Sequence, residues 1–84
     1  MEQMQRQRPP TPGIGIHDCC EILRANQISK TEDILRDQIQ AGLFSWAIPS
    51  IVTKEHPRPA PDISRARFIA WVKDFYMLDE VLGV

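Results

Sequence analysis

The sequence has no apolar run long enough to cross a membrane, and its first residues do not resemble a signal for export. No stretch reaches about 18 consecutive apolar residues, the length that a transmembrane helix needs. The opening segment MEQMQRQRPPTPG contains no apolar centre, unlike a secretory signal peptide. We therefore expect a cytoplasmic protein that does not enter the membrane.

Residue types that carry covalent or metal chemistry are also scarce. The two cysteines, Cys19 and Cys20, are adjacent and cannot close a long loop, so we expect them to be reduced and half-buried. His17 and Cys20 share a helical face, but His56 is the only further strong donor, whereas a structural zinc site needs four ligands. With no glycine-rich phosphate loop and no paired carboxylates, we expect no metal, no cofactor and no enzymatic activity.

The chain has 84 residues and a formal net charge of −1, which indicates one small domain without a strongly basic surface. Proteins that bind nucleic acids are more often basic. Residues 1–13 contain three prolines and show no periodicity, so we interpret them as a flexible N-terminal arm preceding a domain at residues 14–84.

Two short helices are expected first. Residues 16–26 place apolar side chains at helical spacing, with acidic residues early and Arg24 late, as the helix dipole favours. The segment SKTE matches a capping box, in which Ser29 and Glu32 would begin a second helix. Gly42 is the expected end of that helix, because glycine readily adopts a left-handed conformation.

A hairpin and a third helix are expected next. Residues 43–54 are rich in β-branched and aromatic residues and predict a strand, and a short strand would return around Asp62 and Ile63. Ser64 is a favourable N-cap for the last helix. Its apolar side chains recur every three or four residues, and its tail YMLDEVLGV would fray or pack on a partner. The recurring residues are Phe68, Trp71, Val72, Phe75, Leu78 and Leu82.

The segments QAGLFSWAI and DISRARFIAWVKDF resemble the small excisionase-like and MerR-like winged helix-turn-helix proteins of phages and mobile elements. The resemblance covers about residues 14–76. It implies an α+β fold with two short helices, a β-hairpin wing and a C-terminal helix. It also implies that the second helix enters the major groove of double-stranded DNA while the wing contacts the backbone.

Such a layout needs cations for phosphates and polar side chains for base edges. The expected DNA-contacting residues on the second helix and the wing are Lys30, Thr31, Arg36, Gln40, Lys54 and Arg58, with His56 as a further wing residue. We expect Phe44 and Trp46 to turn into the core rather than to stack on bases.

A protein-binding adaptor is the alternative function, because a winged-helix scaffold does not by itself imply DNA binding. The second helix carries more acidic than basic residues, and acidic groups repel phosphates. Its partner, or a second copy of the chain, would contact the C-terminal helix and tail. The apolar tail residues are Met77, Leu78, Val81, Leu82 and Val84.

Overall fold

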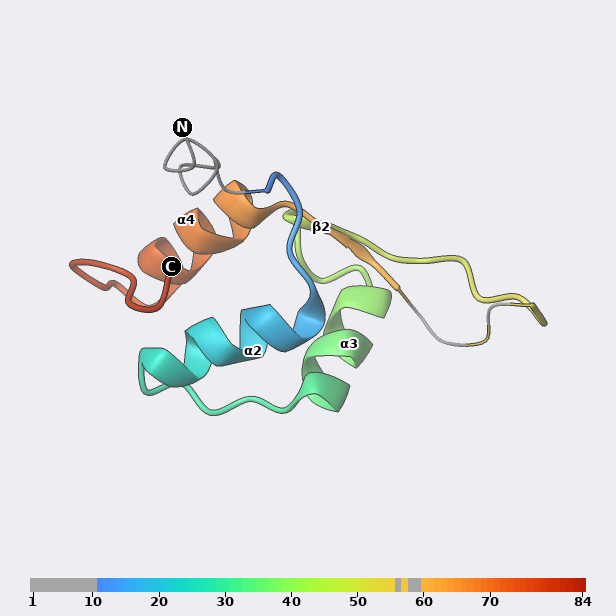
Figure 1. The fold of residues 1–84 in the computed structure, drawn as a ribbon, viewed down its shortest axis with the longest axis horizontal. Helices are drawn as coiled ribbons and strands as arrows, with labels where there is room; N and C mark the ends of the chain where they lie inside the picture. The colour runs from blue at the N-terminus through green and yellow to red at the C-terminus, as the bar shows by residue number, and fades with distance from the viewer. Residues whose placement is uncertain (1–10, 56, 58–59) are drawn as a thin grey trace, which may run out of the picture.

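The structure is a computed structural model that describes residues 11–55, 57 and 60–84. Within these residues it is a small α+β protein with three helices and a two-stranded antiparallel hairpin. The elements are α2 (Ile16–Ala25), α3 (Glu32–Gln40), β1 (Ala47–Ile48), β2 (Asp62–Ile63) and α4 (Arg65–Phe75). Figure 1 shows α2 between α4 and α3, with the loop of the hairpin projecting away from the helices beyond α3.

Helix α2 forms close to the predicted bounds and provides one wall of the core. Asp18 lies in its first turn and Arg24 in its last, where each charge interacts favourably with the helix dipole. One face is buried, and α2 ends where Gln27 adopts a left-handed φ of 66°. This turn lets the chain reverse direction toward α3. The buried residues of α2 are Cys19, Cys20, Ile22 and Leu23.

Helix α3 begins later than the sequence indicated. Thr31, and not Ser29, is its N-cap, because the Thr31 hydroxyl accepts a hydrogen bond from the Ile34 backbone N–H at 3.2 Å. Glu32 is then the first helical residue and does not close a capping box with Ser29. Residues 28–30 belong to no regular element, and Thr31 itself has the extended backbone of an N-cap residue.

The end of α3 confirms the expected glycine conformation. Gly42 has a φ of 76°, and its N–H bonds to the Ile39 carbonyl at 2.9 Å. Leu43 then bonds back to the Gln38 carbonyl at 3.3 Å, which completes the cap. A side chain at residue 42 would meet no neighbouring atom within 4 Å, so backbone conformation alone favours glycine there.

The hairpin is much shorter than the predicted strand over residues 43–54. Among the described residues of this segment, only Ala47 and Ile48 pair, with Ile63 and Asp62 respectively, and Pro49 follows immediately without an N–H to donate. The returning strand at Asp62–Ile63 is confirmed.

Two residues of the predicted arm also join the fold at this point. Gly13 forms a bridge with Ser64, and the Pro12 carbonyl accepts from the Arg65 N–H at 3.0 Å. Residues 1–10 lie outside the described part of the chain.

All six aromatic side chains of the chain belong to one continuous cluster. Phe44 stacks on Trp46 with ring centroids 4.4 Å apart, and Trp46 meets Phe68 edge to face at 5.0 Å. The predicted inward turn of Phe44 and Trp46 is confirmed, since Trp46 is buried and Phe44 partly buried. Phe75, predicted to brace the core, is instead 63% exposed while stacking on Trp71.

Helix α4 has the expected N-cap but ends at Phe75, well before the predicted Leu82. Ser64 accepts from the Arg67 N–H at 3.2 Å, and Met77 then adopts a left-handed φ of 55° that reverses the chain. The tail folds back onto the end of α2. There the Asn26 side chain accepts from the Leu82 N–H at 2.9 Å and donates to the Leu82 carbonyl at 3.0 Å.

In the described ranges, no helix combines the length and apolar character that crossing a bilayer demands.

Candidate functional site

The sequence had placed Lys30 on the second helix. In the structure it lies in the turn before α3. Its Nζ donates a hydrogen bond to Gln38 Oε1 at 2.8 Å and sits 5.8 Å from the centre of the Phe44 ring. These contacts hold the ammonium group against the C-terminal turn of α3, where Gln38 lies. Because the side chain stays partly exposed, its charge remains available to an approaching anion.

Thr31 is also placed just before α3, where its hydroxyl already serves as the N-cap. A second role at a base edge would require the same oxygen to bond outward while it accepts from the Ile34 N–H. The geometry therefore assigns Thr31 primarily to helix formation.

The solvent face of α3 carries more carboxylates than cations. Arg36 Nη1 bonds to Asp33 Oδ1 at 3.2 Å, one turn earlier on the same face. Asp37 is exposed, and the apolar side chain of Ile34 is also 50% exposed. Leu35 and Ile39 supply the buried side instead. Within the described residues, the face thus offers the Arg36 guanidinium paired with Asp33, the Asp37 carboxylate without an ion-pair partner, and the apolar Ile34 side chain.

Gln40 is fully engaged with the first residues of the hairpin loop. Its Nε2 donates to the Ser50 carbonyl at 3.1 Å, and its Oε1 accepts from the Ser50 N–H at 2.8 Å. The amide therefore acts as a brace between α3 and the chain leaving β1. Both of its polar atoms bond to Ser50, so Gln40 has a structural role, and the expected contact with a base stays a prediction.

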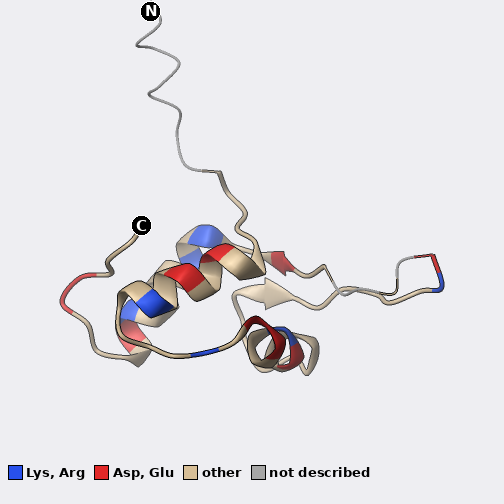
Figure 2. Ribbon diagram, turned by 60° about the horizontal axis from the view of Figure 1, so that its bottom comes forward, with Lys and Arg blue, Asp and Glu red and all other residues tan. Residues whose placement is uncertain are grey.

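Lys54 is the exposed cation in the described part of the hairpin loop. It is exposed, and Glu55 follows it, so basic and acidic residues stand side by side at the far end of the loop (Figure 2). Closer to the helices, Ser50 Oγ accepts from the Ala60 N–H at 3.0 Å and holds the two arms of the loop together. The predicted contacts Arg58 and His56 lie outside the described residues.

A polar link between α2 and α3 was not predicted from the sequence. His17 Nδ1 lies 2.9 Å from Glu32 Oε2, and His17 Nε2 lies 4.0 Å from the Glu21 carboxylate. The hydrogen bond and charge of Glu32 raise the pKa of His17 above its ordinary value of 6.5. Because fifteen residues separate His17 from Glu32, no local pattern could have indicated this pair.

The cysteines are placed where a reactive thiol would be poorly supported. Burial raises the pKa of Cys19 to about 12 and also raises the pKa of Cys20. A buried thiol with a raised pKa forms little thiolate at neutral pH. Over the described residues, no group of three or more histidine, cysteine or acidic side chains comes together as a metal site would require.

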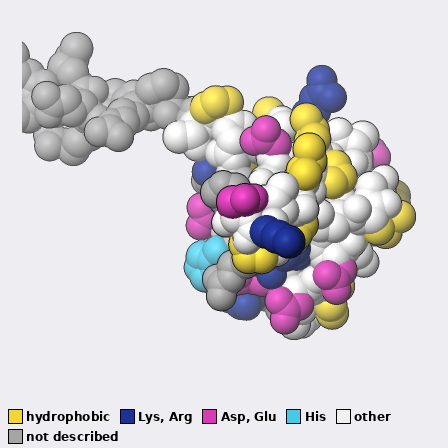
Figure 3. Space-filling view, turned by 90° about the vertical axis from the view of Figure 1, so that its right-hand side faces the viewer, with side chains coloured by type: hydrophobic (Ala, Val, Ile, Leu, Met, Phe, Trp, Pro, Cys, Tyr) yellow, Lys and Arg dark blue, Asp and Glu magenta, His cyan; other side chains and the backbone are white. Residues whose placement is uncertain are grey.

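The face that looks along the projecting loop mixes all side-chain classes. Figure 3 views it end-on and shows hydrophobic, basic and acidic side chains interspersed, without a field of one sign. Exposed apolar residues on the loop and the segments that lead into it are a notable part of this surface. They are Leu43, Ile48, Ile51 and Val52.

Comparisons with protein-family models, with curated proteins and with solved structures found no match to the chain. The geometry of the site therefore carries the functional argument by itself.

Proposed function

We propose that the chain is a small winged helix-turn-helix protein of the excisionase-like or MerR-like type that binds double-stranded DNA. The observation that carries this proposal is the exposure of α3 beside a projecting hairpin. Helix α3 buries only Leu35 and Ile39 and turns its opposite face to solvent, while the loop extends beyond it (Figure 1). A helix presented in this way, following a short turn from α2, matches the arrangement of a recognition helix and its wing.

In this proposal the phosphate contacts come from α3 and from the loop. The Lys30 ammonium lies against Gln38 in the last turn of α3, Arg36 lies on the helix and Lys54 lies on the loop. Such cations fix the position of a protein along the duplex without reading its sequence. Arg58 is also included as a phosphate contact of the wing, and only the sequence supports its inclusion. Thr31 and Gln40 support the proposed contacts through the helix cap and the brace to Ser50.

The carboxylates on α3 set a condition on the proposed complex. Asp33 is partly neutralised by Arg36, whereas Asp37 has no side-chain partner within the described residues. An aspartate in the major groove can accept from the N4 amine of cytosine, but it repels the phosphates on either side. We therefore expect weak overall affinity and strong dependence on ionic strength.

A gel shift at low salt with a pool of random duplexes tests the proposal. Contacts from Lys30, Arg36, Lys54 and Arg58 predict that log K falls against log salt concentration with a slope of about −3.6, at about 0.9 per phosphate. Alanine at any one of these positions should reduce the slope by about 1 unit.

Lys73→Ala is the matched control, because Lys73 is an exposed lysine in the last turn of α4, away from the loop. Absence of binding at low salt, or equal affinities for Lys54→Ala and Lys73→Ala, would reject DNA binding through this surface.

A protein-binding adaptor is the second candidate, and the exposed apolar residues favour it. Ile48 and Ile51 are 67% and 85% exposed on the projecting loop, which is unusual for a surface that meets only phosphates. Ile51→Ser should then abolish a protein complex detected by pull-down and light scattering while leaving the thermal midpoint unchanged. An unchanged complex would count against this candidate, and Thr11→Ser is a conservative control at an exposed residue outside the loop.

A further inference from the structure

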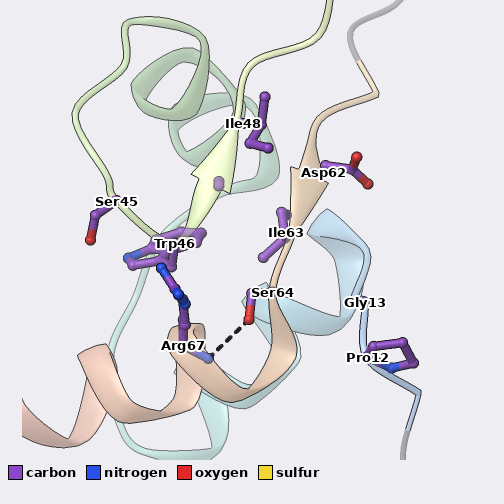
Figure 4. A pocket seen from close by; sticks show the side chains of 10 residues that line it. Pro12, Gly13, Ser45, Trp46, Ile48, Asp62, Ile63, Ser64 and Arg67 are labelled. Carbon is purple, nitrogen blue, oxygen red and sulfur yellow. Dashed lines mark hydrogen bonds between the residues drawn. The ribbon is translucent and has the colours of Figure 1, made fainter.

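A pocket of about 430 Å³ lies between the start of α4 and the base of the hairpin, apart from the outer face of α3. Its walls come from three segments that are distant in sequence: Pro12–Gly13, the β1 strand with the residues before it, and β2 running into α4 (Figure 4). Most of the wall is apolar, with Pro12, Ile48 and the indole of Trp46 contributing.

Trp46 lines this pocket, and its indole carries an unused hydrogen-bond donor that is itself buried. The side chain is only 2% exposed, and its Nε1 has no hydrogen-bond partner in the described part of the structure. A buried N–H without an acceptor costs about 1–3 kcal/mol, so native proteins rarely leave one unpaired. The aromatic neighbours Phe44, Phe68 and Trp71 pack against the ring but offer no acceptor atom.

Arg67 adds a cation to the same wall. It stands in the first turn of α4, and Figure 4 shows its side chain reaching along the wall to the indole of Trp46. Its backbone N–H bonds to Ser64 Oγ, but its guanidinium has no ion-pair partner among the residues that the structure describes. The positive end of the helix dipole lies at this same turn and favours an anion there.

Asp62 does not neutralise Arg67, although both line the pocket. Figure 4 shows the Asp62 carboxylate on the far side of the hairpin from Trp46 and Arg67, beside Ile48, with which it is paired in the strand register. The pocket thus has an electropositive, donor-rich end at Trp46 and Arg67 and an apolar middle. Charge of opposite sign is separated across it.

We propose that this pocket binds an apolar group that ends in a carboxylate. The carboxylate would accept from Trp46 Nε1–H and from the Arg67 guanidinium, and the hydrocarbon part would lie against Ile48 and Pro12. A planar carboxylate suits a guanidinium because it can accept two parallel hydrogen bonds. The apolar wall selects against a fully hydrated inorganic anion, which would lose its water without gaining an apolar contact.

The indole N–H resonance of Trp46 gives a direct test in ¹H–¹⁵N spectra of the full chain. Sodium hexanoate should move this resonance downfield, since a proton that gains an acceptor is deshielded, and should leave the Trp71 indole little changed. Acetate lacks the apolar body and hexylamine lacks the acceptor, so both should bind far more weakly than hexanoate.

Variants separate this site from a general effect of charge. Arg67→Gln should weaken hexanoate binding about tenfold, the loss expected for one charge-assisted hydrogen bond. Lys73→Gln removes a cation from the same helix outside the pocket and should leave the affinity unchanged. Arg67 is exposed, so its replacement should not impair folding, which Trp46→Phe could do.

A second titration distinguishes the source of the carboxylate. The peptide acetyl-Gly-Gly-Leu with a free terminal carboxylate represents the chain end of a partner protein. Binding of the peptide at a lower concentration than hexanoate assigns the pocket to such a chain end, and the reverse order assigns it to a free carboxylate. No shift of the Trp46 resonance with either probe, or equal affinities of Arg67→Gln and Lys73→Gln, would overturn the proposal.

Discussion

The Gln40 side chain and the Ser50 backbone exchange two hydrogen bonds, with donor–acceptor distances of 3.1 and 2.8 Å. Ser50 lies just beyond β1, where Pro49 has ended the regular ladder. The Gln40 amide therefore continues the pattern of backbone pairing with a side chain and ties the projecting loop to the last turn of α3. A movement of the loop relative to α3 would have to break both bonds.

Replacing Gln40 should loosen this connection. Gln40→Ala leaves the Ser50 N–H and carbonyl without their partner and should lower the free energy of unfolding by about 1–2 kcal/mol in urea. Hydrogen exchange of the Ser50 amide should accelerate. Gln40→Glu retains the acceptor for the Ser50 N–H and should therefore protect that amide better than alanine does. Unchanged exchange at Ser50 in Gln40→Ala would contradict the brace.

Removing the unpaired carboxylate from α3 should strengthen DNA binding if the proposed interface is correct. Asp37→Asn keeps the shape of the side chain and deletes one charge that opposes phosphates, so the affinity at low salt should rise about threefold, the scale of one exposed charge interaction. Asp79→Asn, in the tail beyond α4, is the control for net charge. A decrease in affinity for Asp37→Asn in gel shifts would argue against this placement of α3.

The stability of the α2–α3 pair should depend on pH through His17. The pKa of His17 is raised by Glu32, so the folded protein holds this proton more tightly than the unfolded chain. The resulting stabilisation is fully present below pH 6.5, the ordinary pKa, and is lost as the pH rises through the raised value.

Thermal midpoints measured by circular dichroism between about pH 5.5 and 8.5 test this linkage. The midpoint should fall across this range in the native chain and fall less in Glu32→Gln, which removes the charge that holds the proton. Glu21→Gln should have a smaller effect, because Glu21 lies 4.0 Å from His17. Parallel pH profiles for the native chain and Glu32→Gln would show that the pair does not contribute.

The two cysteines should resist alkylation in the folded protein. Cys19 and Cys20 are both buried, and the pKa of Cys19 is raised to about 12, so iodoacetamide should react with them only as urea unfolds the chain. Ser29→Cys introduces an exposed thiol in the turn before α3 and should be modified rapidly under the same native conditions. Mass spectrometry counts the adducts, and rapid native modification of either natural cysteine would contradict their burial.

Asn26 should control whether the tail stays attached to α2. Asn26→Ala removes the bonds to the Leu82 backbone and one to the Ile22 carbonyl, and should lower the free energy of unfolding by about 1–3 kcal/mol. Limited proteolysis after Tyr76 should accelerate. Asn26→Asp keeps an acceptor for the Leu82 N–H, so its free energy of unfolding should fall less than that of Asn26→Ala. Equal proteolysis of all three chains would mean that the clasp does not hold the tail.

The sequence predicted those features that depend on neighbouring residues. Ser64 caps α4, Gly42 ends α3 in a left-handed conformation, and the hairpin returns at Asp62–Ile63. Each depends on a short-range rule of backbone chemistry or on alternation within a few residues. The burial of Trp46 also followed, because a large aromatic between a helix and a strand in a small domain usually supplies core volume.

The errors arose where two local signals competed or where the partner was distant. Ser29 and Thr31 are both good caps, and only the path of the turn from Gln27 decides between them. The apolar spacing predicted that Phe75 would be buried, but α4 runs past the end of the core there and then stops.

The DNA-contacting residues expected from the sequence stay a prediction, but the structure shows what several of these side chains contact. Lys54 is exposed as a contact residue should be, whereas Gln40 is committed to Ser50 and Thr31 to the helix cap. Polar side chains suited to base edges are equally suited to backbone groups, and the sequence does not say which of the two lies within reach. The unpaired Trp46 N–H gave no sequence signal, since it arises from packing alone.

Because every aromatic ring belongs to one cluster, the fluorescence and near-ultraviolet dichroism of the protein report on the packing of that single cluster. Trp46 and Trp71 are 5.3 Å apart, and the remaining rings contact one or both of them. Emission from the two indoles and the near-ultraviolet dichroism should consequently change together when any wall of the interior opens. If the fluorescence and the near-ultraviolet dichroism changed at different temperatures during thermal unfolding, the helices and the hairpin would be shown to unfold in separate steps.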